Sequence, residues 1–388
     1  MIFLTNSDVQ QVLTMKDCIR VLEEGELEQA RGELVARPRI DVITSTRTPH
    51  RFYRWGTMEG TSKRLQAHAI RMKSDVVYWV KSGDRVVEEK YASRPGLFCG
   101  LVFLFDTSTG EPLALMQEGY LQHLRVGARN ALGVKYLARQ DSSTVGMLGS
   151  GGMARSHLIA FCEVRPVKRA RVFSPTRQHR EAYAREMEAL LGIEVAPVPS
   201  AEEAVKRADI VSCCTNSMLP VLSGGMVEPG VHITNVSNEL FDDVPPKVDV
   251  TLEHARNRIF RGSPIPQNQG AGGAALVYAA LNEEEIKEVE NSAGARYAPK
   301  KVEGEKPRSG LKARKVSLAA LISRAPGIEG RLRDDEISAS AGVLRDRSSE
   351  GGQGLSFVTV GKLVYDLARE KGLGREIPTE LLLQDIKD

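Results

Sequence analysis

The glycine-rich segment VGMLGSGGMARSH (145–157) is the clearest candidate for a ligand-binding turn. It matches G-x-G-x-x-A, in which the first glycine permits a tight turn, the second lets the backbone approach a pyrophosphate, and the small last residue lets a helix pack on a sheet. An apolar strand pattern precedes the segment and a helical pattern follows it, so the helix start can offer N–H groups to phosphate. The sequence therefore predicts a dinucleotide-binding turn. Its residues are Gly149, Ser150, Gly151, Gly152, Met153 and Ala154.

The residues after the second strand of this region indicate which dinucleotide is bound. NAD sites place a carboxylate there, about 20 positions past the glycines, to bind the ribose 2′-hydroxyl, but VFSPTRQHR (172–180) contains none. Ser174, Thr176 and Arg177 could instead bind a 2′-phosphate, since a guanidinium pairs with phosphate through a fork of donors. The alternative is that the arginines here are only solvated at a helix start. NADP(H) is therefore predicted ahead of NAD(H), which stays possible, and Thr215, at the end of ADIVSCCT, completes the predicted cofactor-binding residues.

Three basic residues in the first third of the chain stand in structured or apolar contexts. They are Arg39 in RPRIDV, Lys73 in AIRMKSD and Arg125 in LQHLRVGARN. A buried cation needs either an internal carboxylate or an anionic ligand. Ordinary ion pairs or surface charges are the simpler interpretation, because composition alone cannot select three residues from 53 lysines and arginines.

The predicted secondary structure that positions these residues changes along the chain. Residues 14–31 and 121–137 have the apolar spacing of helices, and the region between them reads as strands broken by turns. From about residue 144 strand and helix patterns alternate, which indicates βαβ units and a parallel sheet. An amphipathic helix over 357–371 closes the chain, with Gly372 suited to its C-cap.

The composition is that of an ordinary globular protein and excludes several functions. The chain has 388 residues, enough for two domains, with 41% hydrophobic and 27% charged residues. A net charge of +3 gives no reason to expect nucleic acid or an anionic membrane as a partner. Five cysteines without C-x-x-C and seven histidines without H-E-x-x-H predict no metal site. The start lacks signal-peptide features, and no apolar run spans a bilayer, so we expect a cytoplasmic protein.

Four segments together resemble the ornithine cyclodeaminase/μ-crystallin family: AIRMKS, LQHLRVGARNALGVKYLAR, VGMLGSGGMARSH and EPGVHITNVSNE. The likeness covers most of the chain, up to the GLGREIPTE tail, and is weakest between about 264 and 320. It implies an α/β fold with a Rossmann dinucleotide-binding domain (131–321). An α+β substrate-binding and dimerisation domain would be formed from both chain ends (1–130 and 322–388), and the protein would be a homodimer.

The resemblance also implies roles for individual residues. In this family an arginine near the first strands, a lysine in a G/R-x-K segment and the arginine of an R-T-A-A-like helix bind the substrate carboxylate; they correspond to Arg39, Lys73 and Arg125. Arg125 is followed by Val-Gly-Ala instead of Thr-Ala-Ala. The family's Asp or Asn after a later strand corresponds to Glu239 without gaps, or to Asn238 after a slip of one residue. Lys73 and Glu239 are therefore the predicted catalytic residues.

These residues predict an NADP(H)-dependent oxidoreductase acting on the C–N bond of a small α-amino or α-imino acid, as an imine or ketimine reductase or an amino-acid dehydrogenase. Arg39 and Arg125 would hold the carboxylate, with Lys73 over it or over the imine nitrogen, and Glu239 would handle the amine proton or activate a water. One alternative is a cyclodeaminase, a lyase that releases ammonia from an ornithine-like amino acid with NAD as catalytic cofactor. The other is a non-catalytic ligand-binding protein, as in the crystallin branch.

Two segments depart from the family pattern. Residues 83–95 (GDRVVEEKYASRP) look like an expanded hairpin between the lysine and arginine positions, and could reshape the substrate site. Residues near 282–315 look like a charged insertion on the surface. The family's usual substrate therefore cannot be assumed for this chain.

Overall fold

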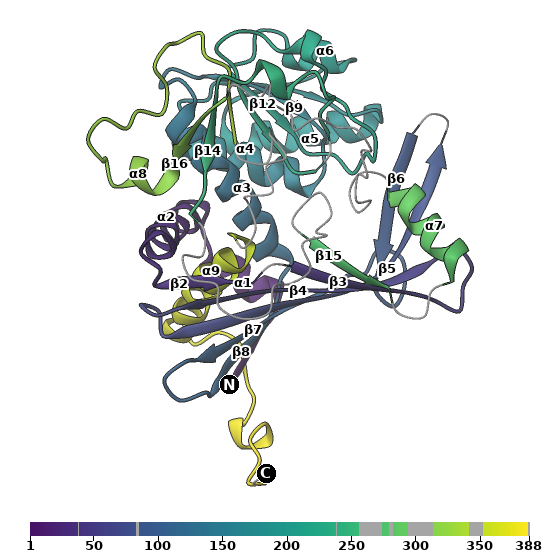
Figure 1. Cartoon of the computed structure of the whole chain (residues 1–388), viewed down its shortest axis with the longest axis vertical. Helices are drawn as coiled ribbons and strands as arrows, with labels where there is room; N and C mark the ends of the chain where they lie inside the picture. Colours follow the sequence, from purple (N-terminus) through teal and green to yellow (C-terminus); the bar gives the residue numbers. More distant parts are fainter. Residues whose placement is uncertain are drawn as a thin grey trace.

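The computed structural model describes residues 1–37, 39–82, 85–237, 239–255, 274–278, 282–293, 313–340 and 352–386. Within these ranges the chain forms one parallel and one mixed β-sheet, with helices on and between them (Figure 1). The predicted α/β class is confirmed. None of the helices in the described ranges has the length and apolar character needed to cross a membrane.

The parallel sheet forms the upper part of the molecule in Figure 1 and has the order β11-β10-β9-β12-β13-β17-β14-β16. Its strands are β9 (Thr144–Leu148), β10 (Arg169–Phe173), β11 (Glu194–Pro197), β12 (Ile210–Cys213), β13 (His232–Asn235), β14 (Val250–Glu253), β16 (Arg314–Ser317) and β17 (Ser338–Ala339). The chain order reverses at β9, which has β10 on one side and β12 on the other. In such sheets ligands bind at this reversal, beyond the carboxyl ends of the strands. The glycine turn follows β9 at that position.

The mixed sheet forms the lower part of the molecule and has the order β15-β3-β4-β5-β7-β8-β1-β18, with β2 beside β4 and β6 beside β5. Its strands are β1 (Ile2–Leu4), β2 (Leu34–Ala36), β3 (Arg39–Ser45), β4 (Phe52–Ser62), β5 (Ala67–Ser82), β6 (Arg85–Tyr91), β7 (Cys99–Asp106), β8 (Pro112–Gln117), β15 (Ala274–Tyr278) and β18 (Arg375–Glu376). Burial alternates residue by residue along β4, as expected when only one face of a sheet packs on a core.

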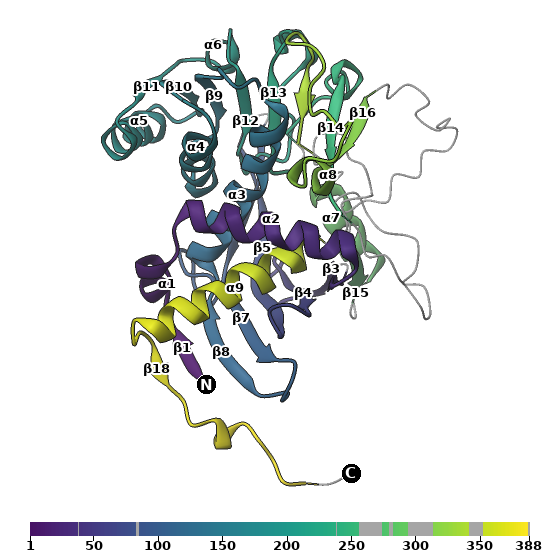
Figure 2. The ribbon, with the colours of Figure 1, turned by 90° about the vertical axis from the view of Figure 1, so that its left-hand side faces the viewer.

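Some of the helices lie between the two sheets, and their buried residues join both sheets in one of three hydrophobic clusters of the described residues. The helices are α1 (Asn6–Val12), α2 (Met15–Arg31), α3 (Gly119–Leu137), α4 (Gly152–Val164), α5 (Arg177–Leu191), α6 (Ala201–Val205), α7 (Glu283–Ala293), α8 (Leu318–Ile322) and α9 (Gly352–Glu370). Figure 2 shows α2 and α9 side by side across the mixed sheet, below the parallel sheet. Gly60 of β4 lets α9 approach closely, because a Cβ there would overlap the Gly354 backbone. The predicted helices at 14–31, 121–137 and 357–371 are confirmed, although the last begins five residues earlier.

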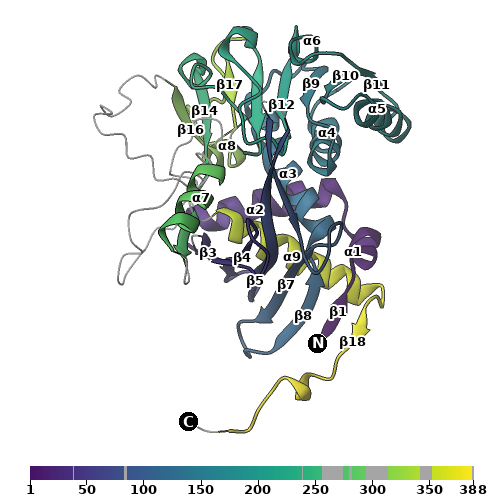
Figure 3. The same ribbon diagram turned by 90° about the vertical axis from the view of Figure 1, so that its right-hand side faces the viewer.

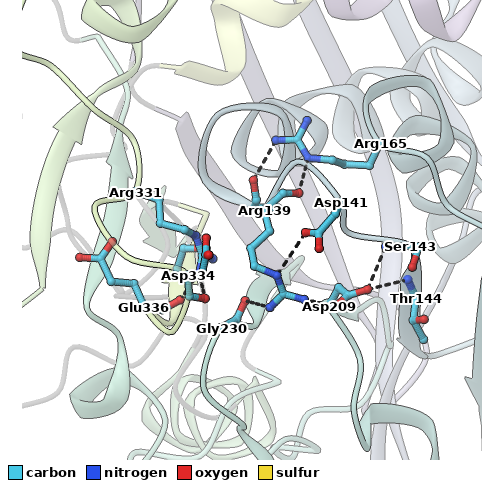
Figure 4. A network of polar contacts seen from close by, with 12 residues as sticks. Arg139, Asp141, Ser143, Thr144, Arg165, Asp209, Gly230, Arg331, Asp334 and Glu336 are labelled. Atoms are coloured by element: carbon cyan, nitrogen blue, oxygen red, sulfur yellow. Dashed lines mark hydrogen bonds and ion pairs between the residues drawn. The ribbon is translucent and has the colours of Figure 1, made fainter.

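A polar network fixes the amino ends of the parallel strands, at the opposite edge from the glycine turn (Figure 4). Asp209, just before β12, accepts hydrogen bonds from the backbone N–H groups of Ser143 and Thr144 at 2.8 and 2.9 Å. Arg139 pairs with Asp209 and donates to the Gly230 carbonyl before β13 at 3.1 Å. The network therefore aligns the amino ends of three neighbouring strands.

Three sequence assignments differ from the structure. Within the predicted charged surface insertion near 282–315, residues 283–293 form α7, and Val289 of this helix is buried against Ile43, Phe52 and Val77 of the mixed sheet. Strand β15, assigned to the Rossmann segment, pairs with β3 in the mixed sheet, and β17, assigned to the substrate segment, pairs with β13 in the parallel sheet. Strand partners this far apart in sequence cannot be read from local patterns. The rest of 282–315, from 294 to 312, lies outside the described residues.

Candidate active site

A row of residues crosses the inner face of the mixed sheet, which is the face that α9 covers. Lys73 on β5 stands directly opposite Gly56 on β4 and Gly100 on β7, and Gly56 stands opposite Asp41 on β3. Directly opposed residues point to the same face of a sheet. A Cβ on Gly56 would overlap the Asp41 carboxylate, and one on Gly100 would overlap Glu118. The two glycines therefore make room for acidic side chains on both sides of Lys73.

The environment of Lys73 disfavours its charge. Burial, and then repulsion from Lys90, lower the pKa of the ammonium to about 7, against the attraction of Asp75. The Nζ atom lies 3.3 Å from Oδ2 of Asp75, which is almost fully buried. A lysine whose pKa lies near neutrality can donate or accept a proton at physiological pH.

Arg71 lies two residues before Lys73 and on the same face. It is 2% exposed, and its Nε and Nη2 donate to the Glu118 carboxylate at 2.5 and 2.8 Å. Its Nη1 is buried and has no hydrogen-bond partner among the described residues. Burial acts to raise the pKa of Glu118, but its hydrogen bonds and ion pair with Arg71 outweigh this and lower the pKa. Arg71 therefore keeps one donor available in a buried place, where an unpaired donor is costly unless a ligand accepts it.

The side chain of Arg125 extends from α3 into the buried region around Arg71. Its guanidinium lies over the Phe357 ring of α9 at 4.8 Å, and Arg71 lies over that ring at 5.8 Å. Burial, and then repulsion from Arg71, lower the pKa of Arg125 to about 9, with a smaller contribution from Arg39. Arg39 pairs with Asp41 through an Nε–Oδ1 contact of 2.6 Å. The structure thus brings the three predicted cations, Arg39, Lys73 and Arg125, around Arg71.

Arg71, Glu118 and Phe357 are site residues that the sequence did not predict. For Arg71 a signal was present, because strand side chains alternate and AIRMKS places Arg71 on the face of Lys73. Glu118 comes directly before α3 and Phe357 belongs to the last helix, so their contacts with β5 depend on the tertiary fold.

The glycine turn has the geometry that a dinucleotide's pyrophosphate needs. Gly149 has φ +113°, and a Cβ there would overlap the Cys214 carbonyl, so glycine is required. A Cβ on Gly151 would meet no atom within 4 Å, which leaves open space in front of the turn. Gly151 is the N-cap of α4 without a side-chain cap, and Ala154 is fully buried beneath it. The turn and the helix start therefore fit the group that the sequence predicts, because they offer N–H groups beside open space.

The residues that the sequence predicts to bind a 2′-phosphate lie next to the glycine turn. Ser150 in the turn donates its hydroxyl to the Ser174 hydroxyl after β10 at 2.9 Å. Arg177 begins α5, has 79% of its side chain exposed and pairs with Glu181 at 2.6 Å. Ser174, Thr176 and Arg177 therefore lie at the carboxyl end of β10, where the segment contains no carboxylate.

Glu239 lies among the loops at the carboxyl ends of β12 and β13. It is fully buried, and its carboxylate accepts hydrogen bonds from the N–H groups of Thr215 and Ser237 at 3.4 and 2.5 Å. Thr215 follows β12 and adjoins the turn, because Cys214 contacts Gly149. Asn238, the alternative to Glu239, lies outside the described residues. The catalytic role of Glu239 stays a prediction. Across the described ranges, no group of three or more His, Cys, Asp or Glu residues is placed to bind a metal.

Comparisons with known proteins identify the family to which the chain is similar. A family model described as the ornithine cyclodeaminase/mu-crystallin family matches residues 1–289. The chain is 34% identical over 139 residues to a Delta(1)-pyrroline-2-carboxylate reductase of Bacillus cereus, covering 36% of this chain and 42% of that protein. It is 34% identical over 135 residues to the ketimine reductase mu-crystallin of Rattus norvegicus, covering 35% of this chain and 42% of that protein. The alignments thus span less than half the length of these relatives.

A solved structure extends the likeness in fold to nearly the whole chain. The Delta(1)-pyrroline-2-carboxylate reductase of Thermococcus litoralis, solved in complex with NADH and L-proline, superposes with a TM-score of 0.68. It shares 24% sequence identity, and the superposition covers 97% of this chain and 100% of that one. The two proteins therefore have the same fold.

Proposed function

The chain belongs to the ornithine cyclodeaminase/mu-crystallin family, and we propose that it is an NADP(H)-dependent oxidoreductase acting on the C–N bond of a small α-amino or α-imino acid. The observation that carries the proposal is the buried, unpartnered Nη1 of Arg71 beside Lys73 and Arg125. Cations gathered in one buried place repel one another, and an anionic ligand relieves that repulsion. A carboxylate suits the forked donors of arginine. The names of the relatives, reductases of pyrroline carboxylate and of ketimines, support the same substrate class.

The chain's own residues supply binding and proton transfer. Arg71, Arg125 and Arg39 hold the carboxylate and so fix the carbon beside it. Lys73, with its pKa near 7, donates a proton to the imine nitrogen during reduction, or takes one from the amine during oxidation. Glu239 is proposed to handle the amine proton or to activate a water. A nicotinamide bound at the glycine turn supplies or accepts the hydride.

The proposed preference for NADP(H) leads to a test at Arg177. Because segment 172–180 contains no carboxylate, Ser174, Thr176 and Arg177 are proposed to bind a 2′-phosphate, for which Arg177 exchanges its exposed ion pair with Glu181. Arg177→Ala is expected to weaken NADPH binding roughly tenfold, since one charge-assisted contact is lost, and to leave NADH binding unchanged. Titration of cofactor fluorescence measures both affinities. Arg185→Ala, an exposed arginine on the same helix, is the control. A wild type that binds NADH much better than NADPH would contradict the preference.

The activity itself is tested by NADPH oxidation over a panel of cyclic imines, and of 2-oxo acids with ammonia or methylamine. Net oxidation of NADPH with any of these substrates supports the proposal. Ammonia release from ornithine without net change in cofactor absorbance would show a cyclodeaminase instead. Tight cofactor binding with no turnover on the panel would show a ligand-binding protein.

We also propose a homodimer formed through the outer face of the mixed sheet. Ile70, Met72, Leu101, Phe103 and Leu115 point away from Arg71 and Lys73. They are only partly buried and lie outside the hydrophobic clusters of the described residues. A contiguous apolar sheet face of this kind is typical of an interface between subunits.

The dimer predicts that Phe103→Glu yields a monomer, because a charge at the centre of an apolar interface is not solvated there. Light scattering coupled to gel filtration measures the mass. Leu190→Glu on α5, where the leucine is 61% exposed, is the control and should keep the mass of the wild type. A monomeric wild type would exclude the proposed dimer.

A further inference from the structure

The long strand β5 and its partner β6 form an arm that leaves the mixed sheet. Residues 67–74 of β5 pair with β7, whereas residues 76–82 pair with β6. Figure 3 shows this arm rising from the sheet towards the parallel strands. It includes part of the segment at which the sequence departs from the family pattern (83–95). Because a two-stranded ribbon is at best marginally stable alone, its contacts determine where it lies.

The outer edge of the arm contacts the loop after β12. Val87 forms an antiparallel bridge with Ser217, and the Met218 N–H donates to the Val86 carbonyl at 2.9 Å. The Ser217 N–H in turn donates to the Thr215 hydroxyl at 3.3 Å. Since the Thr215 N–H donates to Glu239, the arm is connected to both predicted residues at this side of the site.

The inner side of the arm carries an ion-pair chain that ends at Lys73. Glu88 of β6 accepts two hydrogen bonds from Arg54 of β4, at 3.2 Å each. Arg54 also contacts Asp75 at 3.4 Å, and Asp75 contacts Lys73 at 3.3 Å. Glu88, Arg54 and Asp75 are 9%, 4% and 1% exposed, so the chain is shielded from water. In such a buried series of ion pairs, removing one charge changes the electrostatic energy of each of the other charged groups.

We propose that the β5–β6 arm positions the catalytic groups: Glu88 orients Lys73 through Arg54 and Asp75, and the pairing with Ser217 and Met218 holds the loop that carries Thr215. The arm thus joins the substrate cations to the cofactor side of the site. The proposal rests on the proposed function, in which Lys73 and a nicotinamide act on the same carbon. A misplacement of about 1 Å in such an arrangement can reduce the rate about 100-fold.

Removing the charge of Glu88 should lower the pKa of Lys73. The groups that act on its ammonium are Lys90 of β6, Asp75 and Arg71 of β5, and Glu118 at the start of α3. Without the Glu88 carboxylate, Arg54 is expected to pair more closely with Asp75. Asp75 then stabilises the Lys73 ammonium less, and the lysine loses its proton at lower pH.

The test compares Glu88→Gln with Glu89→Gln, which makes the same chemical change on the opposite face of β6. The rate at which acetic anhydride acetylates Lys73 is followed against pH by peptide mass spectrometry. In Glu88→Gln the midpoint should fall by roughly half to one pH unit, whereas Glu89→Gln should match the wild type. Identical profiles in all three proteins would overturn the proposal. Acetylation needs no turnover, so this result is independent of whether any imine is reduced.

A disulfide between Val87→Cys and Ser217→Cys tests the other contact and does not depend on the folding of Glu88→Gln. Antiparallel bridge partners lie within disulfide range. If the arm is a fixed positioning element, the oxidised protein should keep NADPH binding and turnover within about twofold of the form reduced with dithiothreitol. Oxidised and reduced wild type control for the five native cysteines. Activity lost on oxidation and restored by dithiothreitol would overturn the proposal, because the arm would then have to move.

Discussion

Replacing Lys73 by methionine is expected to lower kcat/KM at least about 1000-fold for any imine that the wild type reduces, because general acid–base catalysis contributes about 100- to 10,000-fold. Lys73 lies beside Arg71 on the inner face of the mixed sheet, and its pKa near 7 suits proton transfer at neutral pH. Methionine keeps most of the length of the unbranched side chain and removes the amino group that carries the proton. NADPH binding should be unchanged, since the glycine turn lies on the other sheet.

The same variant should not lose stability. The pKa of Lys73 is lowered from 10.5 to about 7 by burial and by Lys90. As the pH falls from 10.5 to 7, the unfolded chain binds a proton that the folded protein does not, so wild-type stability declines through this range and is then level below pH 7. Lys73→Met removes this penalty, and its Tm should equal or exceed that of the wild type at neutral pH.

Steady-state kinetics, cofactor fluorescence and thermal unfolding together measure the effects of Lys73→Met. Lys63→Met, an exposed lysine in the turn before β5, is the control and should leave all three unchanged. Loss of NADPH binding together with turnover, or a large drop in Tm, would place Lys73 in a structural role. Turnover close to that of the wild type would remove it from the reaction.

The secondary structure around the proposed cofactor site was largely predictable from sequence because its signal is local. The strand, the turn and the helix around Gly149 and Gly151 follow one another in the chain. A Cβ at Gly149 would overlap the Cys214 carbonyl, whereas a Cβ at Gly151 would fill open space. The end of β10 could be located in the same way, by counting from the turn. Glu239 could be placed only to within one residue, since it lies in a loop without periodicity.

The proposed substrate site depends on strand pairings that the local sequence pattern does not contain. Arg39, Lys73 and Arg125 were found through the family resemblance, and nothing in their neighbourhoods showed that β3, β5 and α3 meet. Glu118 approaches Arg71 because β7, β8 and α3 bring it back over Gly100. The link from Glu88 to Lys73 is less visible still, since it passes through Arg54 on a third strand. Strand register determines such contacts, and register is a tertiary property.

Replacing Gly151 by alanine is expected to weaken NADPH binding roughly 10- to 100-fold without changing Tm. The backbone at Gly151, with φ −84° and ψ −171°, is extended and open to any residue, and a Cβ there meets no protein atom within 4 Å. The fold therefore does not require glycine at this position. If the open space holds the pyrophosphate, the added methyl group occupies it, and such overpacking costs about 1–3 kcal/mol.

Gly149→Ala is the matched comparison, and this variant should lower the stability of the folded state. Gly149 has φ +113°, and a Cβ would overlap the Cys214 carbonyl, so the folded state itself is strained. We expect its free energy of unfolding to fall by about 2–4 kcal/mol, from backbone strain and overlap together. Thermal unfolding and NADPH fluorescence titration separate the two effects. If Gly151→Ala bound NADPH like the wild type, the open space at α4 would not be the phosphate site, and the cofactor would have to bind elsewhere; a loss of stability equal to that of Gly149→Ala would instead make both glycines structural.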